Sequence, residues 1–122
     1  MNINLNFKAQ FAEPVRSGEK RQTIRPRGQR RAKVGDTLYL FTGMRTKHCE
    51  RLRNEKCLVA VPIDIDTRTN TLYGNFLTGQ PMNTHDMLLI EKLDGFKNSA
   101  EFFAFFRKQY GEGIHQMILY RW

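Results

Sequence analysis

Cysteine and long apolar runs are scarce in this chain of 122 residues, and each scarcity excludes a class of protein. Two cysteines, Cys49 and Cys57, are too few for a disulfide scaffold. Even with His48 they lack the paired spacing and the fourth ligand of a zinc site, so we expect no metal, and Cys57 is read as a core residue. The longest apolar runs, such as Cys57–Val61, are too short to cross a bilayer. We therefore expect one cytoplasmic domain over residues 1–122, monomeric by default and without a membrane partner.

Acidic residues are also scarce relative to basic ones, since the chain has 12 Asp and Glu but 20 Lys and Arg. The excess lies between Arg16 and Lys56, where thirteen basic residues accompany four acidic ones. A positive field this concentrated attracts phosphate, which makes RNA or a nucleotide-like ligand the leading class of partner. A basic loop that only keeps the protein in solution is the alternative.

Hydrophobic periodicity indicates a chain that is mainly β. Alternating or apolar segments predict five strands, over residues 3–7, 37–42, 58–65, 71–77 and 116–122. The turn at residues 66–70 joins the third and fourth of them into a hairpin. Pro62 cannot donate a backbone hydrogen bond, so its strand is expected at a sheet edge or at a bulge.

Three helices are predicted, over residues 10–17, from Asn83 or Thr84 onward, and from Asn98 to Gly111. Aromatic residues recur at helical spacing in the last of them, which favours a helix buried against the sheet over a surface that stacks bases. The fold class is thus α+β, with a small, mainly antiparallel β-barrel and two or three helices packed on its side.

A group of chemically useful residues lies within eight positions: Gly18, Lys20, Thr23 and Arg25. The glycine lets the backbone turn, so the polar groups after it can converge on one small ligand. A basic run follows directly, and we expect its side chains to bind phosphate: Arg27, Arg30, Arg31 and Lys33.

Thr23 becomes a useful nucleophile only if a base takes its proton. Lys20 is the lysine nearest to it in sequence, and neighbouring arginines together with burial would lower the pKa of that amine. Arg25 could also stabilise the oxyanion of a tetrahedral intermediate. If residues 22–25 are extended, Thr23 and Arg25 share one face and Ile24 turns inward.

The pattern Gly18-x-Lys20-x-x-Thr23-x-Arg25 resembles the GxKxxExR signature of the ASCH domain, a PUA-like family with a β-barrel core. Residues 34–40 and 94–96 are similar to later landmarks of that family, and the similarity covers residues 7–122. It is closest to small stand-alone members, including those of phages. The segment Met44–Glu55 is longer than in compact members and could cover the cleft or extend a nucleic-acid track.

Thr23 stands where the usual signature has glutamate, as in the branch that hydrolyses the acetyl amide of N4-acetylcytidine. That resemblance implies Thr23 as nucleophile, Lys20 as general base and Asp94, in place of a glutamate, as orienting acid. Arg25 would position or stabilise the anion, and no cofactor is needed. An ordinary turn is the alternative for Asp94. Two other functions remain open: a non-catalytic RNA-binding module, and a ribonuclease using Lys20 or His48 as base.

Overall fold

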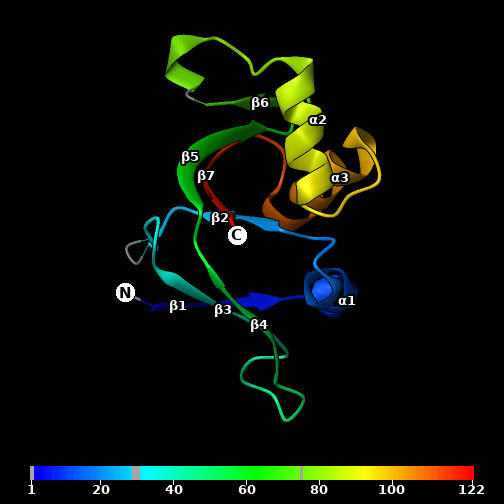
Figure 1. Cartoon of the computed structure of the whole chain (residues 1–122). Coiled ribbons are helices and arrows are strands. Elements are labelled where there is room, and N and C mark those ends of the chain that lie inside the picture. The colour runs from blue at the N-terminus through cyan, green and yellow to red at the C-terminus, as the bar shows by residue number, and fades with distance from the viewer. Residues whose placement is uncertain (1, 29–30, 75) are drawn as a thin grey trace.

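The chain folds into a mixed α+β structure, shown in Figure 1 as a computed structural model that describes residues 2–28, 31–74 and 76–122. Within these residues there are seven strands, three α-helices and one short 3₁₀ helix. In chain order they are β1 (Asn2–Phe7), α1 (Ala9–Ser17), β2 (Gln22–Pro26), β3 (Thr37–Thr42), β4 (Glu50–Lys56), β5 (Val59–Asp66), β6 (Thr71–Tyr73), η1 (Phe76–Thr78), α2 (Thr84–Leu93), α3 (Ser99–Tyr110) and β7 (Ile114–Arg121). The β-rich α+β class predicted from the sequence is confirmed.

Two sheets carry the fold. The first has the strand order β1-β3-β4, and the second has the order β2-β7-β5-β6. β1 runs parallel to β3, and the other pairs are antiparallel. β1 and β2 each form the edge of their own sheet, so the pairing of the described strands contains no closed barrel.

The strand β7 joins two hydrophobic cores, because successive side chains of a strand point to opposite faces. Ile118 and Tyr120 enter the first core with β1, β3 and α1. Met117 and Leu119 enter the second core with β5 and the helices α2 and α3. Figure 1 shows α2 and α3 together on one side of the molecule and α1 beside the first sheet.

The predicted caps define the helices. The side chains of Asn83 and Asn98 accept hydrogen bonds from backbone amides in the first turns of α2 and α3, and α3 ends at Gly111. Phe102 and Phe106 are fully buried, which confirms that the aromatic helix packs in the core. None of the helices in the described part of the chain is long and apolar enough to span a membrane.

The predicted strands are found, but the hairpins differ from expectation. β4 was not predicted, since it lies in the basic segment Met44–Glu55 and its residues are almost all polar. The strand expected over residues 71–77 stops at Tyr73. Pro62 lies on β5 beyond the part that pairs with β6, so its missing N–H faces an unpaired edge, as predicted.

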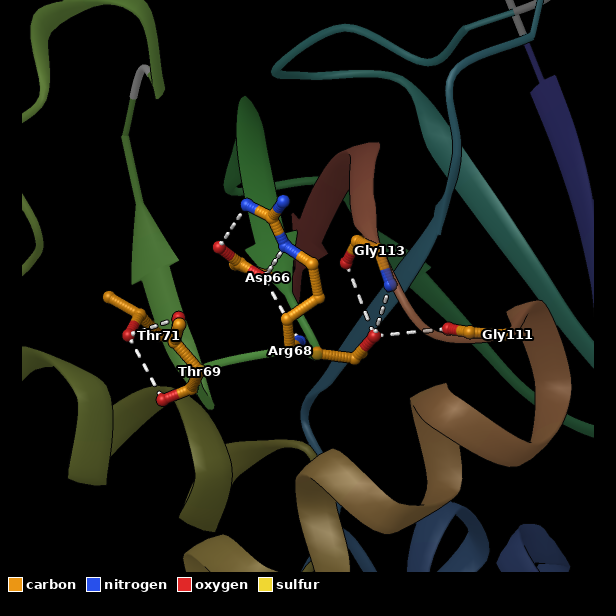
Figure 2. A network of polar contacts seen from close by, with 7 residues as sticks. Asp66, Arg68, Thr69, Thr71, Gly111 and Gly113 are labelled. Carbon is orange, nitrogen blue, oxygen red and sulfur yellow. Dashed lines mark hydrogen bonds and ion pairs between the residues drawn. The ribbon is translucent and has the colours of Figure 1, made fainter.

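Polar contacts tie the β5–β6 turn to the connection between α3 and β7 (Figure 2). Thr67 Oγ1 donates to the carbonyl of Gly111 at 3.0 Å and accepts from the amide of Gly113 at 2.9 Å. Arg68 Nε and Nη2 each donate to the Asp66 carboxylate at 3.0 Å, which lowers the pKa of Asp66. These contacts fix the start of β7, the strand that pairs with β2.

Trp122 closes the first core, and its replacement should destabilise the fold. Its side chain is 3 % exposed and meets the ring of Phe7 edge to face, with centroids 6.0 Å apart. We expect Trp122→Ala to lower the free energy of unfolding by about 3–5 kcal/mol, measured by urea denaturation. Leu77→Ala is the control, because Leu77 is 91 % exposed and should change stability little. A loss below about 1 kcal/mol for Trp122→Ala would contradict this packing role.

Candidate functional site

A cavity of about 230 Å³ lies between the two cores. Aromatic and aliphatic side chains from both cores form its apolar wall, among them Phe7, Phe11, Ile24 and Phe106. Polar side chains also line it, and they include Lys20, Thr23, Arg25 and Asp94. The residues that the sequence motif singled out, together with Asp94 from far along the chain, therefore share one cavity.

The turn after α1 places Lys20, Thr23 and Arg25 in the wall of this cavity. Gly18 has a φ of 86° and caps α1, with its N–H donating to the carbonyl of Val15. A side chain is disfavoured in this left-handed conformation, so the glycine serves the backbone turn, and it is not part of the cavity wall. The chain is then held by backbone bonds from Lys20 to Pro14 and from Arg21 to Leu93 before β2 begins.

Lys20 is buried against Asp94. Its side chain is 3 % exposed, and Nζ donates to the backbone carbonyl of Asp94 at 2.5 Å and lies 3.4 Å from Asp94 Oδ1. The amine also lies 4.8 Å from the ring centroid of Phe11, a distance at which a cation and a π face attract. Asp94 caps the end of α2, so that helix positions the partner of the lysine.

Burial shifts the acid–base properties of both groups. It lowers the pKa of Lys20 from its ordinary 10.5, although Asp94 opposes the shift and Arg25 adds to it. Burial likewise raises the pKa of Asp94, opposed by Lys20 and by a hydrogen bond from Gln22. The pKa values of the two groups are therefore closer together than in water. Lys20 loses its proton more readily than a lysine in water does.

Thr23 and Arg25 lie on the same face of β2, as predicted for an extended segment. Arg25 Nε donates to Thr23 Oγ1 at 2.9 Å, and Arg25 Nη2 donates to the backbone carbonyl of Asn6 at 2.8 Å. The guanidinium lies 4.8 Å from the ring centroid of Phe7. Because the threonine oxygen accepts from a cation, its own proton is available to a base, and an alkoxide there would be stabilised. Ile24 turns into the second core, also as predicted.

Sequence reasoning missed Gln22, which is fully buried behind the lysine. Its Nε2 donates to Asp94 Oδ1 at 3.3 Å and to the carbonyl of Ile90 at 3.0 Å. Its Oε1 accepts from Arg121 Nη2 at 2.8 Å. Gln22 therefore orients the Asp94 carboxylate. A glutamine inside a polar stretch carries no sequence signal of this role.

Tyr110 also belongs to the cavity wall. Burial raises the pKa of its phenol, and Arg25 opposes that shift. The sequence places this residue at the end of the aromatic stripe, where it reads as a core side chain. The other residues that α3 contributes to the wall are Phe105, Phe106 and Gln109.

The described residues of the basic run, Arg27, Arg31 and Lys33, do not line the cavity. Arg27 Nη2 lies 3.0 Å from Asp64 Oδ1, and Arg27 Nε donates to the carbonyl of Met117 at 2.7 Å, so this side chain ties β2 to β5 and β7. Arg31 is exposed and donates to the carbonyl of Gly28, while Lys33 is exposed. Arg30 lies outside the described residues.

The remaining candidates for a ligand site are scattered. Cys57 is buried in the first core, as predicted, and Cys49 is exposed. His48 is exposed in the β3–β4 loop and is not part of the cavity wall. Within the residues that the structure describes, no three His, Cys, Asp or Glu side chains gather as a metal site.

The cavity therefore combines a buried amine, a hydroxyl, a guanidinium and a carboxyl with aromatic and aliphatic side chains. This set can bind a small planar polar ligand, move a proton and stabilise a negative charge. Comparisons with known protein families, with curated proteins and with solved structures find no match for this chain.

Proposed function

We propose that this protein binds the acylated base of a cytidine-type nucleoside or of RNA and hydrolyses the amide of that base. The observation that carries the proposal is the meeting of Lys20, Thr23, Arg25 and Asp94 in one cavity, where the lysine, the threonine and the aspartate are buried. Amide hydrolysis by a hydroxyl needs a base, a nucleophile and a group that stabilises an oxyanion. The three side chains from β2 and the preceding turn supply these functions, and Asp94 orients the base.

The size and the lining of the cavity support a nucleobase as the bound group. Its volume of about 230 Å³ lies below the roughly 300–1,000 Å³ of pockets for drug-sized ligands. Phe7, Phe11 and Tyr110 contribute aromatic side chains to the wall, which suits a heterocyclic ligand.

In the first step, Thr23 Oγ1 forms a bond to the carbonyl carbon of the amide. Its proton passes to the neutral amine of Lys20, and the carbonyl oxygen becomes an oxyanion beside Arg25. Asp94 holds the Lys20 amine through its backbone carbonyl and its carboxylate. The low exposure of these groups strengthens each interaction, because little water competes for it.

In the second step, the bond between the carbonyl carbon and the exocyclic nitrogen breaks. Lys20 returns the proton to that nitrogen, so the unmodified base leaves as a neutral amine. The acyl group remains as an ester on Thr23. Water then attacks the ester, Lys20 accepts a proton from the water and passes it to the departing Thr23 oxygen, and the acid is released.

The same proposal assigns the chain to the ASCH family. On this assignment the two sheets form an open version of the PUA-like barrel, with Arg25 bridging the edge strands β2 and β1 through its bond to Asn6. The segment that contains β4 is then an extension of the compact family pattern.

The direct test is incubation of the purified protein with N4-acetylcytidine. We expect cytidine and acetate to accumulate in proportion to enzyme concentration, measured by liquid chromatography. Protein carrying Glu101→Gln on the exposed side of α3 serves as a matched control and should keep full activity. Absence of cytidine after extended incubation at several pH values would contradict the proposed reaction.

A further inference from the structure

The outward side of the first sheet forms a regular polar and aromatic surface. In β1, Ile3 and Leu5 face the core, whereas the alternate residues are exposed. In β3, Leu38 and Leu40 are fully buried and the alternate side chains are half-buried. We call the outward set the outer face, and its side chains are Asn2, Asn4, Asn6, Thr37, Tyr39, Phe41, Arg51, Asn54 and Lys56.

The strand register arranges these side chains in three rows. The rows across β1, β3 and β4 are Asn2–Thr37–Lys56, Asn4–Tyr39–Asn54 and Asn6–Phe41–Arg51. Neighbours in a row lie close enough to contact one ligand together. The middle strand thus carries the aromatic rings, and the two outer strands carry amides and cations.

The aromatic rings remain accessible. Tyr39 and Phe41 are half-buried, whereas the residues on the opposite face of the same strand, Leu38 and Leu40, are fully buried. The Arg51 guanidinium lies 5.5 Å from the ring centroid of each. A planar cation over two rings extends the flat surface, because a base stacks on a guanidinium as it does on a ring.

The charge of this surface favours an anionic partner. None of the nine side chains of the outer face is acidic, and Arg51 and Lys56 are exposed cations. The loop between β3 and β4 adds Arg45 and Lys47, both exposed, and Figure 1 shows this loop extending away from the body of the protein. The acidic residues of β4 point elsewhere, since Glu50 pairs with Arg16 and Glu55 with Arg53.

We propose that the outer face binds single-stranded RNA. Bases stack on Tyr39, Phe41 and the plane of Arg51, while Lys56 and the loop cations contact phosphates. The asparagine amides of β1 offer donors and acceptors to base edges in addition to two bonds within the protein, from Asn2 Nδ2 to the Tyr39 hydroxyl and from the Met44 amide to Asn6 Oδ1. A single strand fits this arrangement better than a duplex, because stacking on a flat sheet requires bases that are already unpaired.

The outer face borders the cavity through Asn6. This residue ends one row of the outer face and also lines the cavity, where its carbonyl accepts from Arg25. A strand on the outer face could therefore present one nucleotide to the cavity. This last link rests on the proposed function, whereas the binding of RNA by the outer face does not.

The test uses a fluorescently labelled single-stranded RNA of about 12 nucleotides and measures binding by anisotropy. We expect Tyr39→Leu and Phe41→Leu each to weaken binding about tenfold or more, because leucine keeps an apolar side chain but has no π face. Arg51→Ala should also reduce the slope of log affinity against log salt by about 0.7. Tyr73→Leu and Lys97→Ala, both away from the outer face, are the matched controls and should bind like the unaltered protein.

Thermal unfolding of each variant separates lost contacts from lost folding. The inference is overturned if the RNA does not bind, if the outer-face variants bind as tightly as the controls, or if a duplex of the same sequence competes equally well. Turnover of free N4-acetylcytidine distinguishes the two proposals. RNA binding without turnover keeps this inference and rejects the hydrolase, and turnover without RNA binding does the reverse.

Discussion

Replacing Thr23 by alanine should abolish the hydrolysis of N4-acetylcytidine, with a loss in kcat of about 10³-fold or more. The side chain is 4 % exposed in the cavity wall, and its oxygen accepts from Arg25 Nε at 2.9 Å. Alanine removes the nucleophile while the guanidinium keeps its second bond to Asn6. The cavity therefore keeps its shape and its charge, and steady-state kinetics of purified variants measure the loss.

Thr23→Ser is the matched control for this prediction. It keeps the hydroxyl and removes one methyl group, so we expect activity within about tenfold of the unaltered protein. A threonine that only donates a hydrogen bond to the ligand would behave differently. In that case Thr23→Ala would raise KM and leave kcat nearly unchanged, and the assignment of a nucleophile would be wrong.

The local part of the site could be predicted from the sequence because it lies within a few residues. Gly18 signals the turn, and the alternation of β2 places Thr23 and Arg25 on one face. Helix starts were equally predictable, since Asn83 and Asn98 cap through their own side chains. In each case the interaction spans at most a few positions along the chain.

The remainder depends on contacts that only the fold creates. Asp94 lies at the end of α2, and nothing near it in the sequence distinguishes it from a turn residue, yet it is buried beside Lys20. Arg27 has the appearance of a phosphate ligand in the sequence but pairs with Asp64 across the sheet. β4 was not predicted, because its residues are almost all polar and do not alternate between apolar and polar as those of a strand normally do.

The second prediction with a large effect on kcat tests Lys20 as the general base. Only the neutral amine can accept the proton of Thr23, so kcat should rise with pH as Lys20 loses its proton. Burial lowers the pKa of Lys20, and the midpoint of the rise should therefore fall below 10.5. Lys20→Met removes the base, and we expect kcat to drop about 10²–10⁴-fold and its dependence on pH to disappear in this range.

Two controls accompany Lys20→Met. Lys97→Met changes an exposed lysine and should leave both kcat and its pH profile unchanged. Lys20→Met leaves the buried Asp94 carboxyl without its cation, so the double variant Lys20→Met with Asp94→Asn keeps the site neutral and tests whether the fold survives. A pH profile of Lys20→Met that still rises as in the unaltered protein would show that another group is the base.

Protein stability gives an independent measure of the same amine. Since the pKa of Lys20 is lower in the folded than in the unfolded chain, the unfolded chain binds more protons between the lowered value and 10.5. The contribution of this residue to the free energy of unfolding should therefore increase as pH rises through that window. Comparing unfolding of Asp94→Asn with that of the double variant isolates this contribution, because both lack the Asp94 carboxyl, whose own pKa burial shifts. If both show the same change with pH, Lys20 keeps an ordinary pKa in the folded protein and cannot act as the base near neutral pH.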